Sequence, residues 1–121
     1  MLERVVPDEI NQRTTQFIDQ YGKGLHRTLL EKDWFIDNVL LNSQVIGVIR
    51  SLLGPNFKLP VKLPNHRAKC PLPAQAWHRD GEARYGCELN HVQVFYYPQD
   101  TPVELGPTEV LPGSHFLFSL G

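Results

Sequence analysis

Residues 42–63, NSQVIGVIRSLLGPNFKLPVKL, contain the change of hydrophobic period on which the expected fold depends. The first half opens with Asn42, a favoured N-cap residue, and closes with Gly54-Pro55, which ends a helix. Between these limits one helical stripe is apolar, made of Val45, Ile46, Ile49, Leu52 and Leu53. From residue 57 to residue 63 apolar and polar residues alternate instead, which is the period of a strand. Pro60 within this run indicates an edge strand.

A second helix is predicted upstream, in the first third of the chain. It follows Pro7 and Asp8, and its inward face is predicted to consist of Ile10, Thr14, Phe17, Ile18 and Tyr21. Gly22 and Gly24 should end this helix. Residues 25–41 are apolar but mix two periods, so we expect a helix-turn arrangement there.

Short strands are predicted for most of the remaining chain, separated by proline and glycine turns. The runs rich in β-forming residues are AQAWHRD (74–80), HVQVFYYP (91–98) and TEVL (108–111). Pro112-Gly113 marks a turn after the last of them. Helices followed by strands indicate the α+β class, with helices on one side of an antiparallel sheet or sandwich. We expect one domain over residues 1–121, mainly helical over 1–55 and β-rich over 56–121.

Composition and charge restrict the class of partner. The 121 residues are 41% hydrophobic and 21% charged, which is typical of a globular domain. Twelve basic and thirteen acidic residues leave a net charge of -1, which argues against nucleic-acid and membrane-surface partners. No apolar run approaches the roughly 18 residues of a spanning helix, and the N-terminus does not resemble an export signal. We expect a cytoplasmic protein with a small-molecule partner, in which Cys70 and Cys87 are free thiols.

The stretch Trp77-His78-Arg79-Asp80-Gly81 carries the candidate chemistry. Residues two apart on a strand point to the same face, so the imidazole of His78 and the carboxylate of Asp80 should converge. Together they would supply two ligands of a 2-His-1-carboxylate facial triad, an arrangement that favours Fe(II). The alternative is a hydrogen bond between the two that only orients the histidine, and the triplet alone does not separate these interpretations.

A second motif lies downstream, where Leu105-Gly106-Pro107 is followed by Pro112-Gly113-Ser114-His115. The two motifs, in this order and separation, resemble those of the phytanoyl-CoA dioxygenase family of Fe(II)- and 2-oxoglutarate-dependent oxygenases. The similarity covers roughly residues 40–121. The resemblance implies N-terminal helices packed on a double-stranded β-helix of the jelly-roll or cupin-like type. It also implies a dioxygenase that hydroxylates a small organic substrate with O2.

The same resemblance assigns roles to individual residues. His78 and Asp80 become iron ligands, with Fe(II) as the cofactor and 2-oxoglutarate as the co-substrate. Asn65 lies where relatives can place an amide that touches 2-oxoglutarate, and Phe95 lies where an aromatic ring can wall the same pocket. His115 belongs to the turn of the second motif and is not an iron ligand.

Two positions of the family pattern have no counterpart in this sequence. Relatives carry the second iron histidine well after the glycine-serine-histidine signature, and an arginine that binds 2-oxoglutarate after that, whereas this chain ends six residues after His115. We expect a truncated half-barrel with doubtful activity by itself, whose exposed sheet edge would allow self-association, and we do not expect His91 or His115 to replace the absent ligand. Two alternatives stay open. In the first alternative, the chain is a non-catalytic relative that binds a metal or a partner. In the second, it is a zinc hydrolase, which is less favoured because catalytic zinc usually has three protein ligands.

Overall fold

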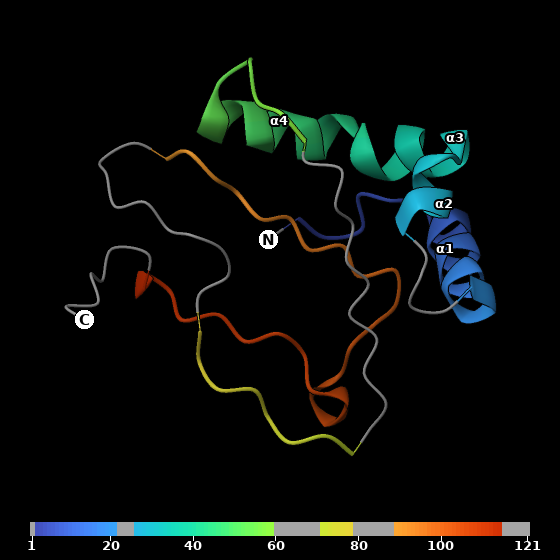
Figure 1. Ribbon diagram of the computed structural model, residues 1–121, viewed down its shortest axis with the longest axis vertical. Helices are drawn as coiled ribbons and strands as arrows, with labels where there is room; N and C mark the ends of the chain where they lie inside the picture. The colour runs from blue at the N-terminus through green and yellow to red at the C-terminus, as the bar shows by residue number, and fades with distance from the viewer. Residues whose placement is uncertain (1, 22–25, 60–70, 79–88, 115–121) are drawn as a thin grey trace.

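The computed structural model describes residues 2–21, 26–59, 71–78 and 89–114. Its elements, in chain order, are α1 (Asp8–Tyr21), α2 (His26–Leu30), α3 (Asp33–Phe35), the π-helical turn η2 (Ile36–Leu40), α4 (Ser43–Leu53) and the 3-10 turn η3 (Val103–Leu105). Figure 1 shows α1 to α4 gathered in one part of the molecule, while the described residues after α4 trace long loops beside them. The helices therefore form the packed part of the structure.

α1 begins after Pro7, whose carbonyl accepts hydrogen bonds from the amides of Ile10 and Asn11, both at 3.0 Å. Ile10 and Thr14 are buried, and the Thr14 hydroxyl donates to the Ile10 carbonyl at 2.8 Å. This bond satisfies a buried hydroxyl within the helix itself. The predicted helix is confirmed, although Tyr21, the last residue of its predicted inward face, is exposed.

Residues 26–41 form short helical pieces in succession, which explains their mixed hydrophobic period. α2 ends in a turn closed by the Lys32 amide, which donates to the Leu29 carbonyl at 3.0 Å, and α3 follows at once. At η2 the Leu41 amide donates to the Ile36 carbonyl at 2.8 Å, in the i to i+5 pattern of a π-helix. This wider turn changes the helical register, so a single period of 3.6 does not continue from α3 into η2. The predicted helix-turn arrangement is confirmed.

The hydrophobic core lies among the first three helices and η2. Its buried apolar side chains are Val6, Ile10, Leu29, Phe35 and Val39. Aromatic rings pack against this core, and Trp34 meets Phe35 edge to face with the ring centroids 5.9 Å apart. Tyr96 meets the same Phe35 ring at 6.2 Å. Tyr96 thus brings the 89–114 segment against the helices.

α4 begins at an N-cap that also holds the N-terminal segment. Oδ1 of Asn42 accepts from the amides of Gln44 and Val45, at 3.1 and 3.4 Å. Nδ2 of the same Asn42 side chain donates to the Val5 carbonyl at 2.9 Å. The helix ends at Gly54, whose φ of 81° lies in the left-handed region that favours glycine. Both predicted ends are confirmed, whereas the apolar stripe of α4 is only partly covered, since none of its residues is fully buried.

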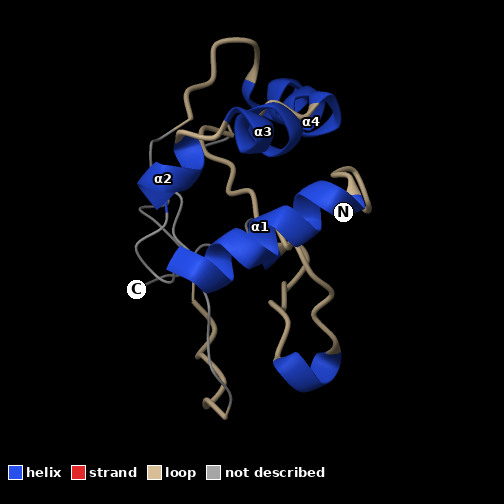
Figure 2. Ribbon diagram, turned by 90° about the vertical axis from the view of Figure 1, so that its right-hand side faces the viewer, coloured by secondary structure: helices blue, strands red, loops and turns tan. Residues whose placement is uncertain are grey.

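The predicted sheet does not occur in the described residues, and the α+β assignment is wrong for them. Figure 2 shows loops and turns in the described parts of the predicted strands, which are residues 57–59, 74–78, 91–98 and 108–111. The backbone bonds found around the last of these regions close local turns, as where the Ser114 amide donates to the Leu111 carbonyl at 3.2 Å. A strand exists only when its backbone pairs with another strand, and a period of two describes side chains alone. The described helices therefore pack on one another and not on a partial double-stranded β-helix.

The described helices are short compared with a membrane span. α1 has 14 residues and α4 has 11, against the about 20 that span a bilayer. Within the described ranges, no helix is both long and apolar enough to cross a membrane.

Candidate functional site

His78 is the member of the predicted iron-binding pair that the structure describes. It lies at the end of the 71–78 loop, and its side chain is exposed. Its Nδ1 lies 2.8 Å from the Ala76 carbonyl oxygen, which can only accept a hydrogen bond, so Nδ1 carries the proton. In a neutral imidazole this places the lone pair on Nε2, the form in which histidine binds a metal. This contact sets the tautomer and ring orientation of His78, while its role as an iron ligand stays a prediction.

The other residues of the predicted site fall mainly outside the described ranges. Asp80 and Asn65 do so, as does His115, so the convergence of Asp80 on His78 stays a prediction. In the part of the chain that is described, no group of three His, Cys, Asp or Glu side chains is arranged to hold a metal ion. His91, which we did not expect to act as a ligand, is exposed.

Two aromatic side chains of the candidate site are open to solvent. Trp77, next to His78, is 69% exposed, and Phe95 is 49% exposed. Phe95 stacks on Tyr97 with the ring centroids 6.5 Å apart and the planes inclined at 19°. The structure thus places Phe95 in an aromatic pair, while its contact with 2-oxoglutarate stays a prediction.

The second motif is a set of turns whose glycines have a conformational role. Gly106 follows η3 with a φ of 67°, and Gly113 has a φ of 79°. An L-residue other than glycine loses about 1–2 kcal/mol in this left-handed conformation. The predicted turn at Pro112-Gly113 is confirmed, and the residues before it, 108–111, form a loop and not the predicted strand.

Two adjacent tyrosines connect the loops of this region to their surroundings. The Tyr96 hydroxyl donates to Oδ1 of Asn11 at 2.7 Å and lies 3.5 Å from the Thr14 hydroxyl. The Tyr97 hydroxyl donates to that of Thr108 at 2.6 Å, within the second motif. The sequence patterns above did not predict either link. The signal that could have found them is alternation, since neighbours on an extended chain point to opposite faces.

Burial also changes the acidity of one of these tyrosines. Desolvation raises the pKa of Tyr96 above the ordinary tyrosine value of 10.0, and the hydrogen bond with Thr14 opposes part of this rise. The raised pKa means that burial disfavours the phenolate. Tyr96 is therefore a neutral hydrogen-bond donor at physiological pH.

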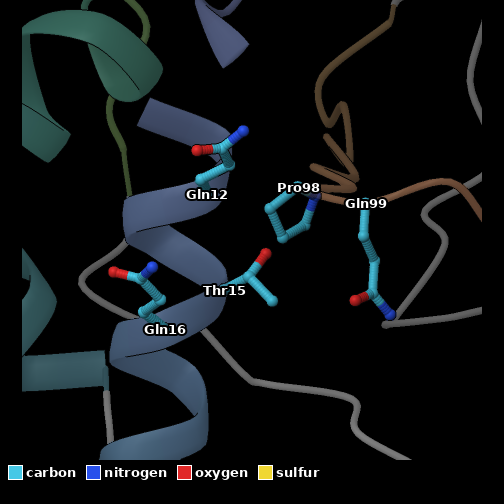
Figure 3. Close-up of a pocket in the computed structure, with 5 residues that line it drawn as sticks. All are labelled: Gln12, Thr15, Gln16, Pro98 and Gln99. Carbon is cyan, nitrogen blue, oxygen red and sulfur yellow. The ribbon is translucent and has the colours of Figure 1, made fainter. Parts of the chain in front are cut away.

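Figure 3 shows an open pocket between α1 and the loop that follows the two tyrosines. Its volume is about 360 Å³, and it is lined by Gln12, Thr15, Gln16, Pro98 and Gln99. The lining side chains include amides and a hydroxyl but no group that titrates near neutral pH. The pocket can offer hydrogen bonds, but its lining residues have no acid, base or preferred iron ligand. None of the predicted site residues lines it.

Comparison with known proteins does not add a family to this description. No family model matches the chain, and no match is found among curated proteins or among solved structures. A functional interpretation therefore depends on the motifs and on the geometry of the described residues.

Proposed function

We propose that the protein is an Fe(II)- and 2-oxoglutarate-dependent dioxygenase that hydroxylates a small organic substrate with O2. One observation carries this proposal, the occurrence of two motifs in the order and separation typical of the phytanoyl-CoA dioxygenase family. The first is Trp77-His78-Arg79-Asp80-Gly81, and the second runs from Leu105-Gly106-Pro107 to Pro112-Gly113-Ser114-His115. Either motif alone would be a weak signal, because short patterns recur by chance.

In this proposal the chain's own residues hold and orient the metal. His78 binds through Nε2, and its Nδ1–H donates to the Ala76 carbonyl at 2.8 Å, which sets the ring orientation. The Asp80 carboxylate is the second ligand, and Asn65 and Phe95 contact 2-oxoglutarate. The family's second iron histidine and its 2-oxoglutarate arginine have no counterpart in residues 1–121, so the proposed site of this chain is incomplete. When bound, the iron with 2-oxoglutarate and O2 supplies the oxidation of a substrate C–H bond to C–OH.

The conformation of the second motif supports the proposal. Gly106 and Gly113 both have a positive φ, so each glycine of the signature stands where the backbone requires one. This agreement explains the motif as a shaped turn, the role that the family resemblance gives it. It does not depend on any strand in the surrounding chain.

A second candidate function is binding of a protein partner without catalysis. The observation that favours it is the exposure of large apolar side chains on the C-terminal loops, where Val103 is 82% and Val110 is 77% exposed. Exposed apolar surface of this kind marks interaction sites when it is contiguous. This function would need no metal, and self-association would appear as a sedimentation coefficient that rises with protein concentration.

Anaerobic titration with Fe(II) and 2-oxoglutarate tests the first candidate against the second. We expect binding with a visible metal-to-ligand charge-transfer band in the native chain. His78→Ala and Asp80→Ala should each weaken binding more than about 100-fold, because loss of a residue that only supports a ligand already weakens metal binding 10- to 100-fold. His91→Ala is the matched control and should bind as the native chain does, since this histidine lies outside both motifs. A folded native chain that gives no band would overturn the dioxygenase proposal and favour the binding protein.

A further inference from the structure

The loop that carries Tyr96 and Tyr97 is held on two opposite sides. On one side Tyr96 is half-buried against Phe35 of the core, with ring centroids 6.2 Å apart, and donates to Asn11 of α1 at 2.7 Å. On the other side the Tyr97 hydroxyl donates to Thr108 at 2.6 Å. Consecutive side chains of an extended segment point in opposite directions, which accounts for the two separate attachments.

The partner of Tyr97 is part of the second motif. Thr108 comes directly after Leu105-Gly106-Pro107 and before the turn at Pro112-Gly113. In η3 and at Gly106 the backbone bonds are local turns, such as the Gly106 amide donating to the Val103 carbonyl at 3.0 Å. Such turns bend the chain but do not attach it to another element. The Tyr97–Thr108 bond is a side-chain bond that does attach it.

We propose that Tyr96 and Tyr97 together link α1 to the second motif. In this link Tyr97 is a positioning residue, which holds the turns of the second motif in place through its bond to Thr108. The first half of the link is the Tyr96–Asn11 bond, and the second half is the Tyr97–Thr108 bond. The Phe95 ring, stacked on Tyr97 with centroids 6.5 Å apart, is held by the same attachment. The predicted effect of this link on iron binding rests on the proposed function. Its predicted effect on the conformation of the second motif is independent of that function.

The variants that test this link remove or keep a single hydroxyl. Tyr97→Phe and Thr108→Val each remove one partner of the bond and nearly preserve shape, while Thr108→Ser keeps a hydroxyl. Amide hydrogen exchange followed by NMR at Leu105, Gly106 and Ser114 reports the turns of the motif. We expect exchange there to accelerate about fivefold in the first two variants, the factor for one net hydrogen bond. The double variant Tyr97→Phe/Thr108→Val should show the same exchange rates as either single variant. Thr108→Ser should show rates close to those of the native chain.

Two further measurements separate positioning from general stability. Exchange at the amides of α1 should be unchanged in Tyr97→Phe, and Tyr21→Phe, which changes an exposed tyrosine of the same chain, should leave the motif unaffected. If the native chain binds Fe(II), Thr108→Val should weaken that binding about fivefold and Thr108→Ser should restore it.

Each outcome decides a separate part of the proposal. Unchanged motif exchange in both Tyr97→Phe and Thr108→Val would overturn the link itself. Faster exchange with unchanged iron affinity would overturn the positioning role. A native chain without iron binding contradicts the proposed function, and the link is then decided by hydrogen exchange alone.

Discussion

The Tyr96 hydroxyl donates to Oδ1 of Asn11 at 2.7 Å, joining residues that are 85 positions apart in the sequence. Nδ2 of Asn11 donates to the Val6 carbonyl at 3.2 Å, which orients the amide oxygen for the tyrosine. The Tyr96 ring also packs against Phe35 in the core. One side chain thus combines a hydrogen bond with aromatic packing to hold a distant loop on the helices.

Removal of this hydroxyl should destabilise the protein. Tyr96→Phe keeps the ring and its contact with Phe35 but loses the bond to Asn11, so we expect a loss of about 1 kcal/mol in the free energy of unfolding. Urea unfolding monitored by circular dichroism measures the change. Tyr21→Phe serves as the control, since Tyr21 is exposed at the end of α1. Equal stability of the Tyr96→Phe variant and the native chain would contradict a stabilising role for the bond.

The same tyrosine should make stability depend on alkaline pH. Burial raises the pKa of Tyr96 above 10.0, so the folded state holds the phenol proton more tightly than the unfolded state does. Its contribution to stability is complete below the unfolded pKa and is lost as the pH rises through the folded pKa. As the pH rises through 10.0 and above, the native chain should lose stability more steeply than Tyr96→Phe. If the free energy of unfolding changed with pH in the same way in both proteins, Tyr96 would have the same pKa in the folded and unfolded states, and the prediction would be wrong.

Asn42 should contribute through two separable interactions. Its Oδ1 caps α4 by accepting from the Gln44 amide at 3.1 Å, and its Nδ2 donates to the Val5 carbonyl at 2.9 Å. Asn42→Ser keeps a capping hydroxyl but has no second donor, so we expect a loss of about 1 kcal/mol. Asn42→Ala loses both functions and should cost about 2 kcal/mol. If thermal or chemical unfolding gave the two variants equal stability, the whole effect would belong to the Nδ2 donor, which bonds the carbonyls of Val5 and Asn38.

Two glycines at α4 should respond in opposite directions to the same substitution. Gly47 lies within the helix, and a Cβ there would meet no atom within 4 Å. Gly47→Ala should therefore raise the free energy of unfolding by about 0.5–1 kcal/mol, because alanine is the better helix former. Gly54 has equal space but a φ of 81°, so Gly54→Ala should lower that free energy by about 1–2 kcal/mol. If urea unfolding showed both Gly47→Ala and Gly54→Ala to be stabilised, or both to be destabilised, the prediction would be wrong.

Local signals predicted the helical part well. Pro7 before α1, the Asn42 cap and Gly54 each act within a few residues, so the limits of α1 and α4 follow from short stretches of sequence. The π-turn η2 could not be predicted in detail, since its wider register shows in the sequence only as a mixed period. The predicted strands failed in the described residues because strand formation needs a partner, which alternation of side chains cannot supply.

In the candidate site, too, some features follow from the sequence and others are visible only in the structure. The residue types and spacing of the two motifs were sufficient to single out His78 and the turn glycines, and they are the basis of the proposed iron chemistry. The tautomer of His78 depends on a carbonyl two residues away, and only the structure showed that contact. Whether Phe95 would be enclosed or exposed also depended on what packs around it.

The amino-acid sequence by itself determined where the two longer helices begin and end and where the chain must turn, because capping, proline geometry and left-handed glycines act over a few residues. Only the tertiary structure decided that Tyr96 lies against α1, that Tyr97 binds Thr108, and that the apolar stripe of α4 is incompletely covered. These features depend on which distant groups meet, and a linear pattern of hydrophobic and polar residues does not specify the partner of any one side chain.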